Sequence, residues 1–220
     1  MSTDEPTENG DAGESEPIET RYTAFEKWEY RQIIYKTEHE QSWRDMAHGY
    51  FEASVLLVDG VAKGSLREDI EGLAAVFLFR HYLELKLKEI ALRGRLLVSE
   101  SENAIREDVK KVANTHELSV LWQWVLDDAK PKMSLWENYD TEFVGKCITE
   151  FDAVDKKGFA FRYSGQGGEF CRFDFAALSY KMRHIRDVSD GIATYLYEAR
   201  QENREYDEYL EWEYGSSASE

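Results

Sequence analysis

Hydrophobic residues recur every three or four positions through most of the chain, which is the period of an amphipathic α-helix. The first clear run begins at Ser42 and ends near Gly60 to Gly64, with these residues at helical spacing: Trp43, Met46, Ala47, Tyr50, Ser54, Leu57, Val58 and Val61. A second run, from about Arg67 to Leu92, is apolar on nearly all sides after Leu73. A helix that is hydrophobic all round is normally central. The pattern therefore predicts two long helices, the second of them buried.

Three shorter helices are predicted after the buried one. They cover about Glu102 to Ala113, Leu118 to just before Pro131, and about Thr141 to Val154. The first two are preceded by pairs with the spacing of a capping box, Ser99 with Glu102 and Asn114 with Glu117. The sequence therefore places several helix starts as well as helices.

The helical period breaks at residues 159–173, where two aromatic-rich runs flank a group of glycines. This pattern is typical of a short β-hairpin. A last helix follows from Phe175 to about Gln201, and Asp174 is well placed to cap it. The predicted fold class is mainly α, with a small β-hairpin insertion before the last long helix.

Charge separates the two ends of the chain from its middle. The 220 residues include 44 acidic and 27 basic side chains, for a net charge of -17. Residues 1–20 carry -7 and residues 198–220 carry -6, so the region between them is nearly balanced at -4. We interpret 1–20 as a disordered acidic N-terminal tail, 21–201 as the folded domain and 202–220 as an acidic, aromatic C-terminal tail. The start of that domain, residues 21–36, is rich in aromatic residues whose spacing fits neither the period of a helix nor that of a strand.

Composition also bears on ligands and compartment. Phosphate binding needs clustered cations, so the acidic tails disfavour nucleic acid while the balanced middle permits a phosphate-bearing ligand. The longest apolar run, Leu73 to Phe79, has seven residues, and a membrane span needs about 20. The N-terminus lacks the pattern of a signal peptide. Cys147 and Cys171 are expected to be reduced thiols, with a structural disulfide as the alternative. We expect a cytoplasmic protein that does not span a membrane.

The strongest candidate site lies on the buried helix, where Arg80, His81, Glu84 and Lys88 fall along one stripe over three turns. Buried ionisable groups must be paired or shift their pKa, so these residues either satisfy one another or line a cleft. In a cleft, Arg80 and Lys88 would neutralise phosphate, His81 would act as general acid or base, and Glu84 would orient His81 or pair with Arg80. The alternative is a buried Arg–Glu pair with a hydrogen-bonded His that fixes the helix register.

Other candidates come from outside that helix. His116 precedes the predicted helix at 118, where free amide donors could help to hold a phosphate; the alternative, which we favour, is a residue of the capping turn. Arg162 and Tyr163 lie on the predicted hairpin, and Arg162 points either into the same cleft or into solvent. The chain has no His-Glu-x-x-His motif and no Cys–His cluster at zinc spacing, so neither a metal nor a cofactor is expected.

Three segments together resemble a known family. They are Phe77–Lys88, His116-Glu-Leu ahead of Leu121-Trp122, and Phe159–Tyr163. Through them the chain resembles the HEPN-like (higher eukaryotes and prokaryotes nucleotide-binding) proteins of bacterial defence-associated gene neighbourhoods, over roughly residues 42–197. The resemblance implies an antiparallel helical bundle, a homodimer, and metal-independent RNase activity of a toxin or antiviral effector. In the family's nucleases several residues separate the Arg from the His, whereas His81 directly follows Arg80 here.

These features lead to three hypotheses about function. The first is a HEPN-like defence or toxin-type protein that acts on RNA or a nucleotide. Its predicted catalytic residues are Arg80, His81, Glu84 and His116, and its predicted binding residues are Lys88, Arg162 and Tyr163. The second is a non-catalytic dimerisation or protein-interaction module whose charged stripe is structural core and whose C-terminal tail docks a partner protein. The third is an acidic nucleic-acid mimic that binds a basic protein.

Overall fold

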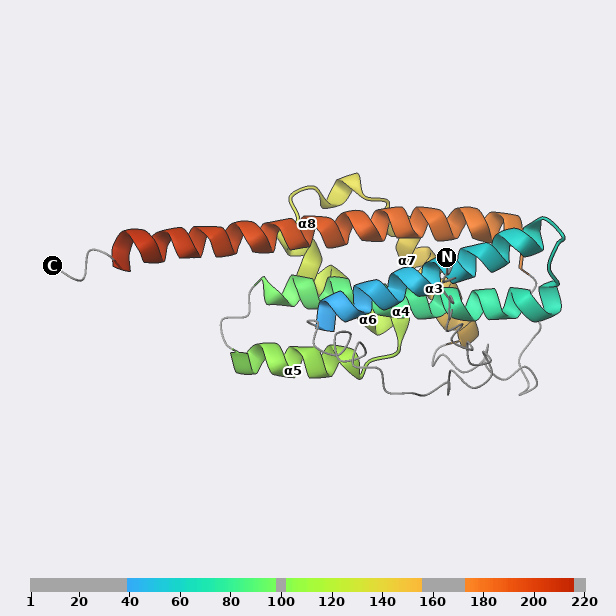
Figure 1. The fold of residues 1–220 in the computed structure, drawn as a ribbon, viewed down its shortest axis with the longest axis horizontal. Helices are drawn as coiled ribbons and strands as arrows, with labels where there is room; N and C mark the ends of the chain where they lie inside the picture. Colours follow the sequence, from blue (N-terminus) through green and yellow to red (C-terminus); the bar gives the residue numbers. More distant parts are fainter. Residues whose placement is uncertain (1–38, 98–101, 156–172, 216–220) are drawn as a thin grey trace, which may run out of the picture. The chain divides into compact units, whose positions relative to one another are not determined.

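The computed structural model describes the backbone of residues 39–97, 102–155 and 173–215. The chain divides into two units, Met1–Thr37 and Glu38–Glu220, and every described residue belongs to the second. The described part is helical (Figure 1), and its elements are α3 His39–Ala62, η1 Glu68–Gly72, α4 Leu73–Leu96, α5 Glu102–Ala113, α6 Leu118–Trp124, η2 Val125–Ala129, η3 Lys130–Lys132, η4 Trp136–Asn138, α7 Thr141–Asp155 and α8 Phe175–Gly215. The mainly helical fold class is therefore confirmed for these residues.

Some of the sequence predictions fall outside these ranges. The acidic tail at 1–20 and the aromatic-rich segment after it are not among the described residues. The predicted hairpin at 159–173 also lies outside them, except for Phe173, which belongs to no regular element. No strand occurs in the described part of the chain, so the hairpin stays a prediction.

Helix α4 is the centre of the described fold. It packs against α3, α8, α6, α5 and η2. From Phe79 to Arg95 every residue except His81 is buried. The prediction of a buried central helix is confirmed, although the chain enters it through the π-helical turn η1 rather than through a regular α-helix.

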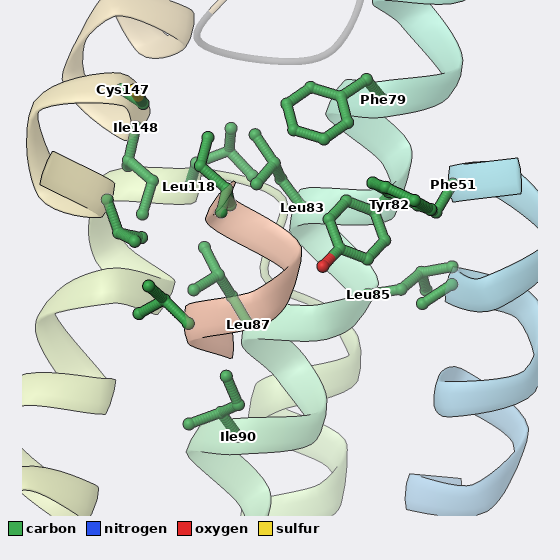
Figure 2. Packing of buried hydrophobic residues seen from close by; sticks show 14 of the residues in the cluster. Phe51, Phe79, Tyr82, Leu83, Leu85, Leu87, Ile90, Leu118, Cys147 and Ile148 are labelled. Atoms are coloured by element: carbon green, nitrogen blue, oxygen red, sulfur yellow. The ribbon is translucent and has the colours of Figure 1, made fainter. Parts of the chain in front are cut away.

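Aromatic side chains join α4 to its neighbours on two sides. Figure 2 shows Tyr82 facing Phe51 of α3, with a ring separation of 5.0 Å. Phe79 lies 5.5 Å from Phe151 of α7. Aromatic pairs of this kind contribute about 0.5–1.5 kcal/mol beyond the area they bury. Helix α3 runs antiparallel to α4 (Figure 1), and the turn between them uses Gly64 at a φ of 72°, a conformation that favours glycine.

Helix α4 also makes a close approach to the backbone of η2. A Cβ added at Gly94 would lie 2.9 Å from the amide nitrogen of Ala129 and 3.0 Å from its Cα. Real Cβ atoms do not tolerate such distances without movement of their neighbours. A glycine at this position therefore lets α4 lie directly against η2.

Helix α8 begins as predicted and continues farther. The Ala177 amide donates to Asp174 Oδ1 at 3.0 Å, which confirms Asp174 as the helix cap. The apolar stripe ends with buried Leu196, which is why the sequence predicted an end near Gln201. The backbone nevertheless remains helical to Gly215, and the described side chains between Tyr197 and Tyr206 are exposed or half-buried.

Candidate functional site

Four of the predicted site residues form one ion network, which we call the Glu84 network: Arg80, Glu84, Lys88 and His116. Arg80 Nη1 donates to Glu84 Oε2 at 3.1 Å, and Lys88 Nζ donates to Glu84 Oε1 at 2.9 Å. His116 Nδ1 lies 2.8 Å from the same Oε1 atom. The spacing of four residues brings the three groups of α4 onto one helix face, and His116 reaches this face from the connection between α5 and α6.

The two cations of the network also hold that connection. Arg80 Nη2 donates to the carbonyl of His116 at 2.9 Å, and Lys88 Nζ donates to the carbonyl of Ala113 at 2.9 Å. Ala113 is the last residue of α5, and the last carbonyls of a helix lack partners within it. Lys88 therefore caps the end of α5, while Arg80 fixes the connection onto α4.

Burial differs sharply within the network. Arg80, Glu84 and Lys88 are 1%, 5% and 4% exposed, whereas the side chain of His116 is 62% exposed. Burial acts to raise the pKa of Glu84, but hydrogen bonds and positive charge from Lys88 and His116 outweigh it, and the pKa lies below its ordinary value. Glu84 is therefore ionised at neutral pH. Because an ionised carboxylate only accepts hydrogen bonds, Nδ1 of His116 is the donor in its hydrogen bond with Glu84.

His81 does not join the network. It is half-buried and packs against Tyr50 of α3, with ring centroids 5.0 Å apart, and against Phe77 at 5.3 Å. Successive residues on an α-helix are rotated by about 100°, so His81 faces α3 while Arg80 faces the α5–α6 connection. The spacing of three between His81 and Glu84 suggested one common stripe, but His81 contacts α3 whereas Glu84 contacts the α5–α6 connection.

The capping turn before α6 also differs from the prediction. Glu117 stands at the helix start in an extended conformation and makes no side-chain capping bond. The amide of Ser119 donates instead to Asp152 Oδ2 of α7 at 2.8 Å. Because that donor is engaged, it is not available for a phosphate, which was the less favoured of the two interpretations of His116.

The remaining predictions about the site concern other residues. Arg162 and Tyr163 lie outside the described residues, as does Cys171. Cys147 is buried on α7, and burial raises the pKa of its thiol. In the described ranges, no group of three or more His, Cys, Asp or Glu side chains could hold a metal ion. A search of the same ranges found no helix with the length and apolar character of a membrane span.

A second ion network on α4 was not predicted from the sequence. Lys86 Nζ lies 2.7 Å from Glu89 Oε2 and 2.7 Å from Asp190 Oδ1 of α8. Arg93 Nη2 lies 3.0 Å from Glu89 Oε1, and its Nη1 donates to the carbonyl of Ala193 at 2.6 Å. Glu89 is 0% exposed. The spacing of 86, 89 and 93 by three and four residues was the available signal.

Arg95 makes a third charged link near the end of α4. Its guanidinium pairs with Asp108 of α5 at 3.2 Å and with Asp128 of η2 at 2.7 Å. It also lies over the ring of Trp124 at 4.5 Å, and Lys111 lies 5.1 Å from the same ring. Charged groups of α4 thus join α5, η2 and α8 as well as the α5–α6 connection.

A comparison with family models, with curated proteins and with solved structures finds no match to this chain. The HEPN-like resemblance therefore stays a prediction from sequence.

Proposed function

We propose that the chain is a non-catalytic helical module that binds a partner protein, with the Glu84 network as part of its structural core. The main support is that Arg80 and Lys88, 1% and 4% exposed, are already engaged with Glu84 and with two backbone carbonyls. A phosphate could reach these cations only by displacing the α5–α6 connection. Breaking a buried charge network is strongly unfavourable, because an uncompensated charge stays behind.

The wider setting in this proposal comes from the sequence alone. The HEPN-like bundle, the homodimer, the cytoplasmic location and the defence-associated role all depend on the resemblance and on composition. The acidic, aromatic end of the chain is a second candidate surface for the partner, since Tyr206 is 62% exposed.

The experiment is a cleavage and binding assay with the purified chain. We expect no metal-independent cleavage of single-stranded RNA and no binding of mononucleotides by the wild type. Arg80→Ala is expected to lower the urea midpoint steeply without changing either result. Cleavage by the wild type that disappears in His116→Ala, with an unchanged circular dichroism spectrum, would refute the non-catalytic module.

A second candidate function, an RNA- or nucleotide-directed enzyme, is favoured by His116. Its exposed ring is held by an ionised, buried carboxylate, an arrangement used in acid–base catalysis. In such an enzyme Glu84 would fix the tautomer of the His116 ring, and Nε2 of His116 would accept a proton from the attacking hydroxyl of the substrate. Arg80 and Lys88 would keep Glu84 charged.

The second candidate has a matched control. His184 is another histidine paired with a carboxylate, at 2.9 Å from Asp140 Oδ2. The candidate predicts that His116→Gln abolishes RNA cleavage, whereas His184→Gln and His81→Gln retain it. Equal activity of all three variants would remove His116 from the mechanism.

A further inference from the structure

An aromatic patch made of one exposed and two half-buried rings lies near the start of α8. We define it as Phe143, Tyr180 and His184, with the carboxylate of Asp140 at its edge. Tyr180 is 71% exposed, and its ring is nearly parallel to that of His184, at 10° and 6.3 Å. Phe143 meets His184 edge-on at 4.9 Å. Tyrosine is enriched in protein interfaces and in their energetic hot spots, so this patch is a candidate docking surface.

The patch is held in place by hydrogen bonds between two helices. His184 Nε2 of α8 lies 2.9 Å from Asp140 Oδ2, just before α7. Asp140 Oδ1 accepts from the amide of Phe143 at 3.4 Å. The hydrogen bond with His184 lowers the pKa of Asp140 below its ordinary value. The carboxylate is therefore ionised at neutral pH, and the His184 ring on which Tyr180 stacks has a fixed orientation that limits the entropy lost on binding.

Charge around the patch favours a cationic ligand. Its neighbouring cations are matched by carboxylates: Lys181 pairs with Glu150, Arg183 with Asp59 and Lys146 with Glu142. Asp140, by contrast, pairs with His184 rather than with a lysine or an arginine. At this edge the Asp140 carboxylate would repel an anionic phosphate, whereas it would attract a cation.

We propose that the aromatic patch binds an arginine side chain of a partner protein. This inference rests on the proposed interaction module and names one of its contact surfaces. A planar guanidinium stacks on the face of Tyr180 and pairs with the carboxylate of Asp140, using both properties that distinguish arginine from lysine.

The test uses the full chain and two labelled peptides of equal length, one of alternating Arg and Gly and one of alternating Lys and Gly. Fluorescence anisotropy is expected to show tighter binding of the arginine peptide. Tyr180→Ala should weaken that binding about fivefold or more, and Tyr180→Phe should preserve it because the ring remains. Since Tyr180 is exposed, neither change should alter the urea midpoint.

Tyr197→Ala is the matched control, because Tyr197 lies on the same helix, is 45% exposed and lies outside the patch. It should leave the affinity for the arginine peptide unchanged. Equal losses in Tyr180→Ala and Tyr197→Ala, or equal affinities for the two peptides, would show that the acidic chain attracts any cation and would overturn the proposal. A wild-type dimer in sedimentation that Tyr180→Ala dissociates would overturn it as well, since the patch would then bind a second copy.

The two proposals can fail separately. If the arginine peptide does not bind and the wild type does not cleave RNA, only the arginine site is refuted. If the wild type cleaves RNA through His116, the non-catalytic module is refuted whatever the peptides do.

Discussion

Replacing Glu84 by glutamine is the most direct perturbation of the charged core. The substitution keeps the size and hydrogen-bonding shape of the side chain while it removes the one negative charge shared by three partners. Arg80 and Lys88, which lie 3.1 Å and 2.9 Å from its oxygens, would remain as two buried cations. His116 would lose its ionised acceptor.

The expected cost follows from burial. Removing one partner of a buried ion pair destabilises a protein by about 3–5 kcal/mol, because the other charge is left uncompensated. The low exposure of Arg80 and Lys88, 1% and 4%, places them in that class. With a urea dependence of about 2 kcal/mol per molar, the midpoint of Glu84→Gln should fall by about 1.5–2.5 M.

The assay is urea unfolding at pH 7, followed by far-ultraviolet circular dichroism. Glu142→Gln is the control, since Glu142 has a comparable ion pair with Lys146 at 2.6 Å but is 81% exposed. We expect no measurable change in that variant, because exposed pairs of this kind contribute little. The same substitution thus compares a buried pair with an exposed one.

One result would refute the reasoning. If Glu84→Gln lowered the midpoint no more than Glu142→Gln does, the Glu84 network would contribute no more than a surface pair. The claim that it forms part of the structural core would then fail, and with it the main support for the non-catalytic module.

The remaining predictions concern pH and packing. Folding lowers the pKa of Glu84, so the contribution of this carboxylate to the free energy of unfolding is present above its ordinary pKa of 4.5 and is lost as the pH falls through the folded-state value. Below pH 4.5 the urea midpoint of Glu84→Gln should therefore fall less steeply than that of the wild type. Burial raises the pKa of Tyr82 well above 10.0, so the contribution of its neutral hydroxyl to the free energy of unfolding is lost as the pH rises beyond 10. Tyr82→Phe should therefore lose less stability at alkaline pH than the wild type, and an equal loss in both proteins would show that Tyr82 is not the cause. Gly94→Ala should destabilise by about 1–3 kcal/mol, since its Cβ has no room beside η2. Gly49→Ala, whose Cβ meets nothing within 4 Å, should stabilise α3 by up to about 1 kcal/mol, and a loss of stability there would contradict the packing.

Much of the helical layout could be predicted because it depends on local pattern. The bounds of α5 agree with the prediction because apolar periodicity marks them, and the start of α8 agrees because Asp174 caps it. The end of α8 was missed, because the prediction followed the apolar stripe and the stripe ends at Leu196. The helix after Leu196 is rich in glutamate, which is a good helix former, so it can continue without such a stripe on intrinsic propensity.

The candidate site was predictable only in part. The spacing of Arg80, Glu84 and Lys88 was sufficient to bring them together, because they share one helix. The partners that complete the network, the carbonyls of Ala113 and His116, could not be foreseen, since they depend on where the α5–α6 connection lies in space. The same reason applies to the partners that Lys86 and Arg93 find on α8, Asp190 and the carbonyl of Ala193.

The hydrogen bond from Arg93 to the carbonyl of Ala193 joins positions 100 residues apart. At a synthesis rate of about 5–20 residues per second, the ribosome needs about 5–20 s to make the chain between them. During that interval the side of α4 that contacts α8 in the folded protein is still uncovered, and it exposes Lys86, Glu89 and Arg93 rather than an unbroken apolar surface. Charged residues placed among hydrophobic ones act against aggregation of unfinished chains. The buried charges at this interface would thus protect the nascent protein before they hold the finished one together.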